Sequence, residues 1–288
     1  MAEIETKEIL DFVDKMPGFS PAVLKIISLA NDPKANPGDI VNAISMDPVL
    51  TAKILRLVNS AYFGPGRNIA SLNRAVIMLG FNTIKNIALS VSVATALSIR
   101  GDFKWFTNDE YWEHCLGCAL AARMLAKATG VGPLQVEEFF VAGLLHDIGK
   151  AVMIQRYGAE CQRIYDPEQA PGRPRHELER ESFGISHARL GGLIAQRWKF
   201  PESLSTAISF HHAPMEAPED HRHLALIVHV ANYTSHHLKI GIQTPANLDN
   251  ISEKAREAFD MPADEIIETT TGLSEAVEDA KVFLQKVS

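Results

Sequence analysis

The 288-residue sequence has few cysteines, no excess of basic residues and no long apolar run, and each scarcity excludes a class of protein. Three cysteines are too few for a disulfide framework in a chain of this length and suit a reducing compartment. Acidic residues outnumber basic ones by 35 to 28, and the sequence pI is about 5.9. The protein therefore has no overall field that would attract nucleic acid or anionic lipid, and we expect no nucleic-acid partner.

Membrane and export signals are also missing from the sequence. The longest weakly polar run, Ile87 to Ile99, has thirteen residues that include three serines and a threonine, which is too short and too polar for a membrane span. Residues Met1 to Lys7 alternate in charge and do not resemble the basic and then apolar regions of a secretory signal. These patterns predict a cytoplasmic protein without a membrane partner.

The hydrophobic pattern predicts an all-α fold. Apolar residues at helical spacing, such as Leu50, Ile54, Leu57 and Val58, recur along the chain, whereas no apolar/polar alternation is long enough for a sheet. A capping residue stands directly before a proline at three predicted helix starts, which are Ser20-Pro21, Asn36-Pro37 and Asp47-Pro48. Gly80 is the predicted end of a helix that starts near Leu72.

The helices fall into two sets. The first hundred residues predict a bundle of short helices, and a second set begins near Glu110. Polar residues and glycine between Gly101 and Asp109 mark the seam, so we predict one lobe over 1–105 and another over 106–288. In the second set we expect helices at 110–128, 134–149, 186–198, 202–212, 221–238, 251–260 and 274–286.

The chemistry is predicted to lie in the second lobe, because all eleven histidines occur between His114 and His237. The strongest local signal is His146-Asp147, which follows the apolar run Phe139 to Leu145. Burying an unpaired carboxylate costs several kcal/mol, so Asp147 needs a cation, a hydrogen-bond network or exposure. A metal ion is the simplest cation that also uses His146, and imidazole with carboxylate suits Fe, Mn, Zn or Co. A purely structural pairing of the two side chains is the alternative.

Further candidate ligands lie on separate predicted helices. His114 follows Glu110 by one turn, His187 follows Ser186 at a helix start, and the doublet His211-His212 closes a helix. Asn232 lies in the continuation of an apolar run, where its amide would be buried. Each residue taken singly is more typical of a structural role, but helices that each project one ligand inward could bring these residues into one polar cleft.

Three other signals are interpreted as structural. Cys115 and Cys118 have the C-x-x-C spacing, but no second pair completes a zinc site, so they are expected in the core. Asn59 is expected to cap a helix end. His221, His223, His236 and His237 lie at the ends of a predicted helix and are expected on the surface.

The residues carry a resemblance to known families. The order His114, His146-Asp147, His187, His211-His212 and Asn232 resembles the HD superfamily of metal-dependent phosphohydrolases. The first half is similar to the HD-related output domain (HDOD) family in four segments, which are Met16-Pro17 with Pro21, Asp47-Pro48-Val49-Leu50, Leu57-Val58-Asn59-Ser60-Ala61-Tyr62-Phe63 and Leu79-Gly80. Together the resemblances cover roughly residues 10 to 240. They imply a stand-alone HDOD protein with an all-α, two-lobed HDOD/HD-like fold.

HDOD proteins are regarded as bacterial signalling modules, and they commonly lack the full HD catalytic set. The resemblance therefore implies a signalling module with a signalling protein as partner. It implies that the metal ligands are His114, His146, Asp147, His187, His211, His212 and Asn232. A small phosphorylated ligand is also compatible with the resemblance. Asn232 stands where HD enzymes have a carboxylate, so it is a weaker ligand for a hard cation. Ala213-Pro214-Met215 follows the doublet in place of Gly-Tyr-Pro, which counts against a cyclic-dinucleotide phosphodiesterase of the HD-GYP type.

The sequence leaves three hypotheses for the function of the protein. The leading hypothesis is a regulatory protein with a metal-binding cleft and little or no hydrolase activity. The second is a metal-dependent phosphohydrolase in which Lys150 stabilises developing charge. The third is a structural scaffold whose histidines bond only to one another.

Overall fold

Side-chain caps start the helices of the first half at the positions that the sequence predicts. In the computed structural model, Ser20, Asn36 and Asp47 each accept a hydrogen bond from a backbone N–H in the first turn of the following helix. Gly80 ends a helix with φ of +88°, a conformation that favours glycine. These contacts satisfy amides that a helix end leaves without a partner, so the local sequence is sufficient to place these ends.

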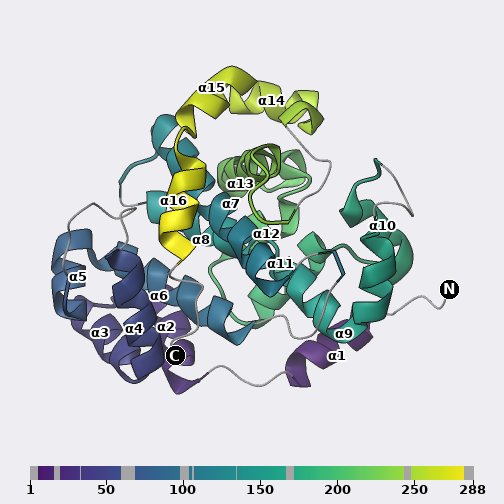
Figure 1. Ribbon diagram of the computed structural model, residues 1–288. Helices are drawn as coiled ribbons and strands as arrows, with labels where there is room; N and C mark the ends of the chain where they lie inside the picture. The colour runs from purple at the N-terminus through teal and green to yellow at the C-terminus, as the bar shows by residue number, and fades with distance from the viewer. Residues whose placement is uncertain are drawn as a thin grey trace.

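The structure describes residues 6–15, 20–32, 34–59, 69–97, 104–105, 107–133, 135–166, 172–242 and 248–281, and within these ranges every regular element is a helix (Figure 1). The all-α prediction is confirmed. The helices of the first half are α1 Thr6–Lys15, α2 Pro21–Ala30, α3 Pro37–Ser45, α4 Pro48–Val58, α5 Leu72–Leu79 and α6 Phe81–Ala96. Those of the second half are α7 Asn108–Ala128, α8 Val136–Leu145, α9 Ile148–Ile164, α10 Arg175–Phe183, α11 His187–Arg197, α12 Glu202–Phe210, α13 Glu219–His237, α14 Glu253–Phe259, α15 Ala263–Thr269 and α16 Leu273–Ala280, with the 3-10 turns η2 Pro214–Glu216 and η3 Leu248–Asn250.

The first half packs around α6. Helices α2, α3, α4 and α5 all contact α6, and α6 in turn packs against α8 of the second half. Asn59 clamps the loop after α4, since its side chain bonds both the N–H and the carbonyl oxygen of Ile69 at 2.7 and 2.9 Å. The structural role predicted for Asn59 is confirmed, whereas Met16-Pro17 and residues 60–63 lie outside the described residues.

Helix α1 does not join the first-half bundle and packs instead against α9 (Figure 1). Arg156 on α9 forms a 2.8 Å ion pair with Glu8, and Arg197 at the end of α11 pairs with Asp14. The N-terminal helix therefore bridges from the first bundle to the second half. Such exposed ion pairs fix its position and contribute little to stability.

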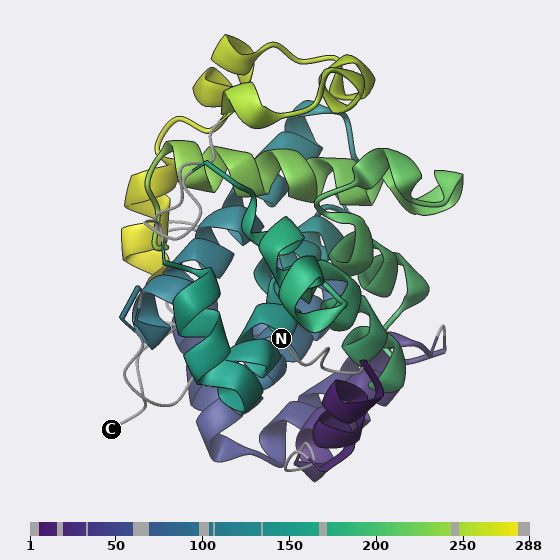
Figure 2. The ribbon, with the colours of Figure 1, turned by 90° about the vertical axis from the view of Figure 1, so that its right-hand side faces the viewer.

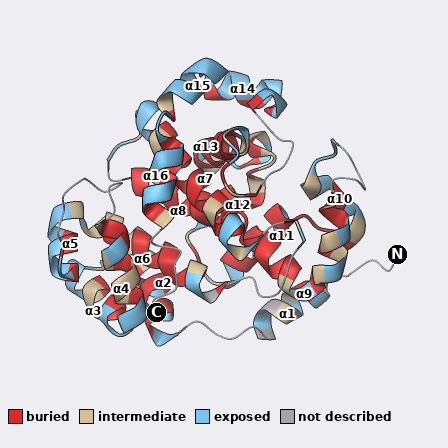
Figure 3. Ribbon diagram, in the orientation of Figure 1, coloured by how far each residue is buried: buried red, intermediate tan, exposed pale blue. Residues whose placement is uncertain are grey.

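The second half is built around α7, α8, α12 and α13, which are buried along most of their length (Figure 3). Helix α13 crosses the upper part of this layer in the view of Figure 2, and the C-terminal helices cover it from outside with largely exposed faces. Among the described residues, no helix is both long and apolar enough to span a membrane.

One predicted helix is wrong in its extent. The expected helix over 134–149 breaks at His146-Asp147, where Asp147 has φ of −98° and ψ of 10°, and a separate helix, α9, continues to Ile164. The apolar periodicity continues across the break and hides it. At the break, the hydroxyl of Tyr111 donates a 3.0 Å hydrogen bond to the carbonyl oxygen of Asp147, which compensates for the interrupted helical bonding. The break turns both ionisable side chains inward.

Candidate metal centre

The turn between α8 and α9 places two ionisable side chains in the middle of the second half. His146 and Asp147 have exposed fractions of 0% and 1%, so neither depends on solvent for its polar partners. Lys150, one turn into α9, contacts Asp147 Oδ2 through its Nζ at 2.6 Å. The buried carboxylate thus has a buried cation as its partner, as its low exposure requires.

Two glycines allow the neighbouring helices to approach this turn. A Cβ at Gly143 on α8 would lie 2.7 Å from the carbonyl oxygen of Cys118 on α7. A Cβ at Gly149 on α9 would lie 2.7 Å from the backbone nitrogen of Gly191 and closer still to the carbonyl oxygen of His187 on α11. Helices α7 and α11 therefore pack on the turn at distances that only a residue without a side chain permits.

Two histidines, from α11 and the end of α12, converge on one oxygen of Asp147, and a third contacts the first of them. His187 Nε2 lies 3.1 Å and His211 Nε2 3.8 Å from Asp147 Oδ1. His187 Nε2 also lies 3.3 Å from His211 Nε2 and 3.0 Å from His212 Nε2. The four side chains form one cluster, although they are up to 65 positions apart along the chain.

The outer nitrogens of three clustered histidines are held by hydrogen bonds. Nδ1 of His146 contacts the carbonyl oxygen of Gly143 at 2.8 Å, and Nδ1 of His211 contacts that of Ile208 at 2.8 Å. Nδ1 of His187 contacts Glu179 Oε2 at 2.6 Å. Because these acceptors require the proton on Nδ1, each Nε2 presents a lone pair to the centre when the ring is neutral.

His114 and Asn232 form the other side of the centre. His114 Nε2 lies 4.0 Å from Asp147 Oδ2 and 3.5 Å from Cys118 Sγ, and the His114 ring stacks on His236 at 4.3 Å. Asn232 on α13 is 4% exposed, and its Oδ1 lies 4.0 Å from Cys118 Sγ. The structure thus brings together every candidate that the sequence indicated, while their role as metal ligands remains a prediction.

Burial and the local charges act in opposite directions on the acids and bases of this centre. Burial alone raises the pKa of Asp147, but Lys150, His146 and His187 outweigh it and hold that pKa well below its usual range. Burial alone lowers the pKa of His187, but Glu179 and Asp147 reverse the effect and raise it. Burial lowers the pKa values of His114, His146, His211 and His212. The centre therefore contains two carboxylates, one lysine, a histidine that favours protonation and four neutral histidines near pH 7.

The donor set fits a divalent transition metal ion. Within the part of the chain that the structure describes, the buried polar atoms without a hydrogen-bond partner include His114 Nδ1 and His146 Nε2, and the second of these faces Asp147. Two groups of three ligand atoms lie within 4.8 Å of one another there, namely His187, His211 and His212, and His146, Asp147 and His211. Imidazole nitrogens whose second nitrogen is held by a carbonyl or carboxylate are typical of metal sites. A third such group, His114, Cys118 and His146, adds a thiol whose pKa burial raises.

A cavity of about 360 Å³ adjoins the cluster. Lys150, His187, His212, Asn232 and His236 form its inner wall. Two further cationic side chains, Arg173 and Arg175, also line it. Cationic side chains and histidines thus line the same cavity, which favours a small anion.

Three residues of the centre are missing from the sequence-based prediction. Glu179 bonds His187 but stands in a run of charged residues in which nothing distinguishes it from the exposed Glu177. His229 contacts the carbonyl oxygen of His211 through Nδ1 at 2.6 Å, and His176 stacks on His212 at 4.1 Å. Only the packing of α10 and α13 against the cluster identifies these side chains.

The surface position expected for His236 is wrong, because its ring stacks on His114 and lines the cavity. Helix α13 turns that side of its last turn toward α7, while His223 and His237 are exposed as expected. Cys115 and Cys118 are both free and buried in α7, as expected, and Cys118 additionally contacts His114.

Comparison with known proteins identifies the relatives of this chain. The family model of the HDOD domain matches residues 16–214. An uncharacterized protein from Treponema pallidum is 31% identical over 226 residues, which are 78% of this chain. The chain covers 43% of that protein, so it spans less than half the length of this relative.

Solved structures share the fold. An HDOD domain protein of unknown function from Geobacter sulfurreducens has a TM-score of 0.77 and 24% identity, with 96% of this chain and 94% of that chain covered. A candidate phosphohydrolase from Shewanella amazonensis has a TM-score of 0.69 and 24% identity, with coverages of 97% and 98%. A candidate signal transduction protein from Marinobacter aquaeolei has a TM-score of 0.77 and 20% identity, with coverages of 99% and 62%. At these identities the likeness concerns the fold alone.

Proposed function

This chain belongs to the HDOD family, and we propose that it is a cytoplasmic signal-transduction protein that holds a divalent metal ion at Asp147 and acts chiefly by contact with a protein partner. The proposal assigns a regulatory lobe to residues 1–105 and the metal-holding lobe to residues 106–288. The protein from Marinobacter aquaeolei, itself a candidate signal transduction protein, supports this choice at the level of the fold.

The observation that carries the proposal is the convergence of imidazole Nε2 atoms on Asp147. His146, His187 and His211 would hold the metal with Asp147, and His114 and His212 lie near enough to add a further ligand. When bound, the metal supplies positive charge at Asp147 and, in a hydrolase, activates water. Without a metal, positive charge beside Asp147 comes from Lys150 and from protonated His187, whose pKa values are both raised. The buried carboxylate therefore stays paired.

Asn232 supports regulation over turnover. Its neutral amide stands where the HD enzymes that the chain resembles have a carboxylate, and its Oδ1 lies 4.0 Å from the Cys118 thiol. A ligand set with one fewer negative charge holds a second metal ion less well, and two-metal clamps are a common device for phosphate-ester chemistry. A site of this kind is better suited to sensing a ligand than to rapid hydrolysis.

Metal analysis of the purified protein tests the proposal. We expect close to one equivalent of Mn, Fe, Zn or Co in the native protein and a large loss in His146→Gln. His237→Gln is the matched control, because His237 is an exposed histidine of the same protein, and it should keep the metal. Native protein that carries no metal after expression in supplemented medium, and binds none on titration, would support the scaffold reading instead.

The second candidate function is a metal-dependent phosphohydrolase, and the cavity favours it. Lys150, Arg173 and Arg175 line a space of about 360 Å³ beside the cluster, which suits a small phosphorylated ligand. Lys150 Nζ is the closest cation to Asp147 and would stabilise negative charge that develops on such a ligand. A panel of phosphate esters assayed with Mn²⁺ and Fe²⁺ decides between the two functions: turnover above about 1 s⁻¹, the low end of typical enzymes, would establish the hydrolase.

A further inference from the structure

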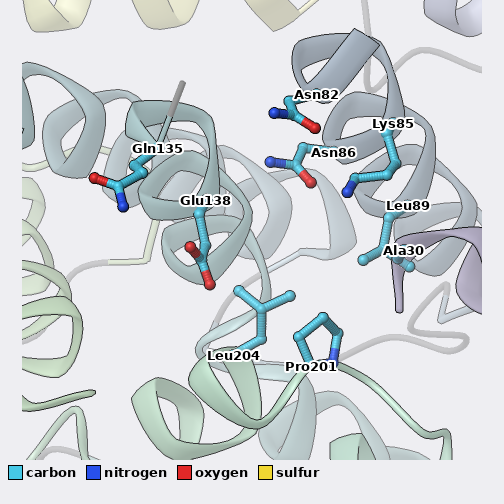
Figure 4. Close-up of a pocket in the computed structure, with 9 residues that line it drawn as sticks. All are labelled: Ala30, Asn82, Lys85, Asn86, Leu89, Gln135, Glu138, Pro201 and Leu204. Atoms are coloured by element: carbon cyan, nitrogen blue, oxygen red, sulfur yellow. The ribbon is translucent and has the colours of Figure 1, made fainter. Parts of the chain in front are cut away.

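A second cavity, of about 230 Å³, lies between the two halves and shares no lining residue with the first (Figure 4). Its walls come from α2, α6, α8 and the start of α12. The lining residues are Ala30, Asn82, Lys85, Asn86, Leu89, Gln135, Glu138, Pro201 and Leu204. Five of these nine residues are polar and carry both charge signs, so the cavity suits a small polar molecule better than an apolar one.

The α6 wall is polar along a single stripe. Asn82, Lys85 and Asn86 lie at positions i, i+3 and i+4, so they share one face of a helix whose other faces are largely apolar and buried. Among the described residues, neither asparagine side chain has a hydrogen-bond partner. Burial lowers the pKa of Lys85, and the charge of Glu138 partly opposes this effect. The stripe therefore presents a partly desolvated cation and two unused amides to the cavity.

The opposite wall carries the negative charge. Glu138, on α8, lies across the cavity from Lys85 in Figure 4. One of its oxygens accepts a hydrogen bond from the hydroxyl of Ser203 on α12. In the part of the chain that the structure describes, no ion pair joins Glu138 to Lys85, so the two charges face each other across the space. Leu89 and Leu204 supply an apolar floor.

We propose that this cavity binds a free α-amino acid with an uncharged polar side chain. Its carboxylate would pair with Lys85 and its ammonium group with the free oxygen of Glu138, while the amides of Asn82, Asn86 and Gln135 would bond its side chain. A phosphate or nucleotide fits less well, because its negative charge would meet Glu138. The volume is also below the roughly 300–1,000 Å³ of pockets for larger ligands.

The position of the cavity connects it to the candidate metal centre. The N-cap of α8, Gln135, lines the cavity, and its C-cap is His146. Leu204 in the first turn of α12 also lines the cavity, and the C-cap of α12 is His211. A molecule that draws α6 toward the first turns of α8 and α12 would shift the last turns, which carry the histidines. This coupling rests on the proposed function, whereas the binding site itself does not.

Isothermal titration of chelator-treated, metal-free protein tests the site. The probes are L-glutamine, L-asparagine, L-serine and L-threonine, and we expect one-to-one binding of at least one with a Kd near or below about 1 mM. Lys85→Met and Glu138→Gln should each weaken binding at least tenfold, since each removes a charge that pairs with the ligand. The control Lys25→Met, which removes an exposed lysine on α2, should leave the Kd unchanged.

Ligand analogues test the same assignment in the unmodified protein and do not depend on how the variants fold. The N-acetyl derivative lacks the ammonium group, the decarboxylated amine lacks the carboxylate, and each should bind at least tenfold more weakly than the parent amino acid. Absence of binding by all four amino acids, equal binding by the analogues, or an unchanged Kd in folded Lys85 and Glu138 variants would overturn the proposal.

The coupling has its own readout. Coupling between two sites is reciprocal, so a metal ion bound at the metal centre should alter the affinity of the amino-acid site. In a titration of Mn²⁺-loaded protein, we expect the amino-acid Kd to change by at least about threefold. Equal Kd values in loaded and metal-free protein would overturn the coupling. Because the first titration contains no metal, failure of the amino-acid site leaves the proposed function intact, and failure of metal binding leaves the amino-acid result valid.

Discussion

Glu179 is joined to Nδ1 of His187 by a 2.6 Å hydrogen bond, at a place where both side chains are almost completely buried. The same carboxylate accepts hydrogen bonds from the backbone nitrogen of His187 at 2.7 Å and from the hydroxyl of Tyr165 at 2.7 Å. Glu179 thereby fixes both the start of α11 and the orientation of the His187 ring. The ring then directs Nε2 into the cluster, 3.1 Å from Asp147 Oδ1 and 3.0 Å from His212 Nε2.

The first prediction concerns Glu179→Gln. A neutral amide holds the His187 ring less firmly and no longer raises the pKa of His187, so Mn²⁺ affinity should fall about 10–100-fold, as is usual for partners of metal-ligating histidines. Calorimetric titration measures the change. Glu181→Gln, two residues along and exposed, should keep native affinity. Native affinity in a folded Glu179→Gln protein would mean that His187 does not bind the metal.

The second prediction concerns Asn232→Asp. A carboxylate at this position adds negative charge beside His114 and Cys118, so divalent-metal binding should tighten, and weak hydrolysis of phosphate esters should appear. The metal-free variant should lose stability, because the new carboxylate is buried without a cation. Mn²⁺ titration and thermal unfolding with and without metal measure both effects. An equal or weaker affinity for Mn²⁺ would place residue 232 outside the ligand set.

The third prediction concerns the approach of α9 to α11. Gly149→Ala places a Cβ against the carbonyl oxygen of His187, so it should destabilise the protein by about 1–3 kcal/mol and weaken metal binding by moving His187. Gly158→Ala in the same helix is the control. No atom lies within 4 Å of its added Cβ, and it should stabilise the helix by roughly 0.5–1 kcal/mol. Denaturant unfolding of metal-free protein distinguishes the two, and similar stabilities would exclude a packing role for Gly149.

The fourth prediction concerns pH. The pKa values of His114, His146, His211 and His212 are lowered by burial, so these side chains take up protons on unfolding. Their contribution to stability is present above the unfolded pKa of about 6.5 and is lost as pH falls toward the lowered values. His187 has a raised pKa and acts oppositely, since its contribution is present below about 6.5 and is lost as pH rises through its folded pKa.

Burial also lowers the pKa values of His176, His229 and His236, so the histidines with lowered pKa values outnumber His187. The Tm of the metal-free protein should therefore fall between about pH 7.5 and pH 5. Bound Mn²⁺ should make the fall steeper, because protons compete for the same nitrogens. His211→Gln should reduce the slope by removing one of these histidines. Thermal unfolding across this range measures it. A Tm that is constant or rises on acidification would mean that these rings take up no net protons on unfolding.

The sequence by itself determined the helical class and most of the helix starts. Ser20, Asn36 and Asp47 cap helices through contacts within three residues, and Gly80 stops one through its own backbone conformation. Such signals are local, so they can be read without the fold. The chain order of His114, His146-Asp147, His187 and His211-His212, through its resemblance to the HD superfamily, also predicted that these residues share one centre.

Only the tertiary structure decided which other side chains join that centre and where helix 134–149 breaks. Glu179 and His236 look like surface residues in the sequence, and α10 and α13 bring them to His187 and His114. The cavity with Lys85 and Glu138 exists only because α6 packs on α8. Helix periodicity reports only which face of one helix is apolar. The distances between crossing helices decide which polar side chains from different helices meet. At Gly143 and Gly149 the absence of a Cβ permits these short distances.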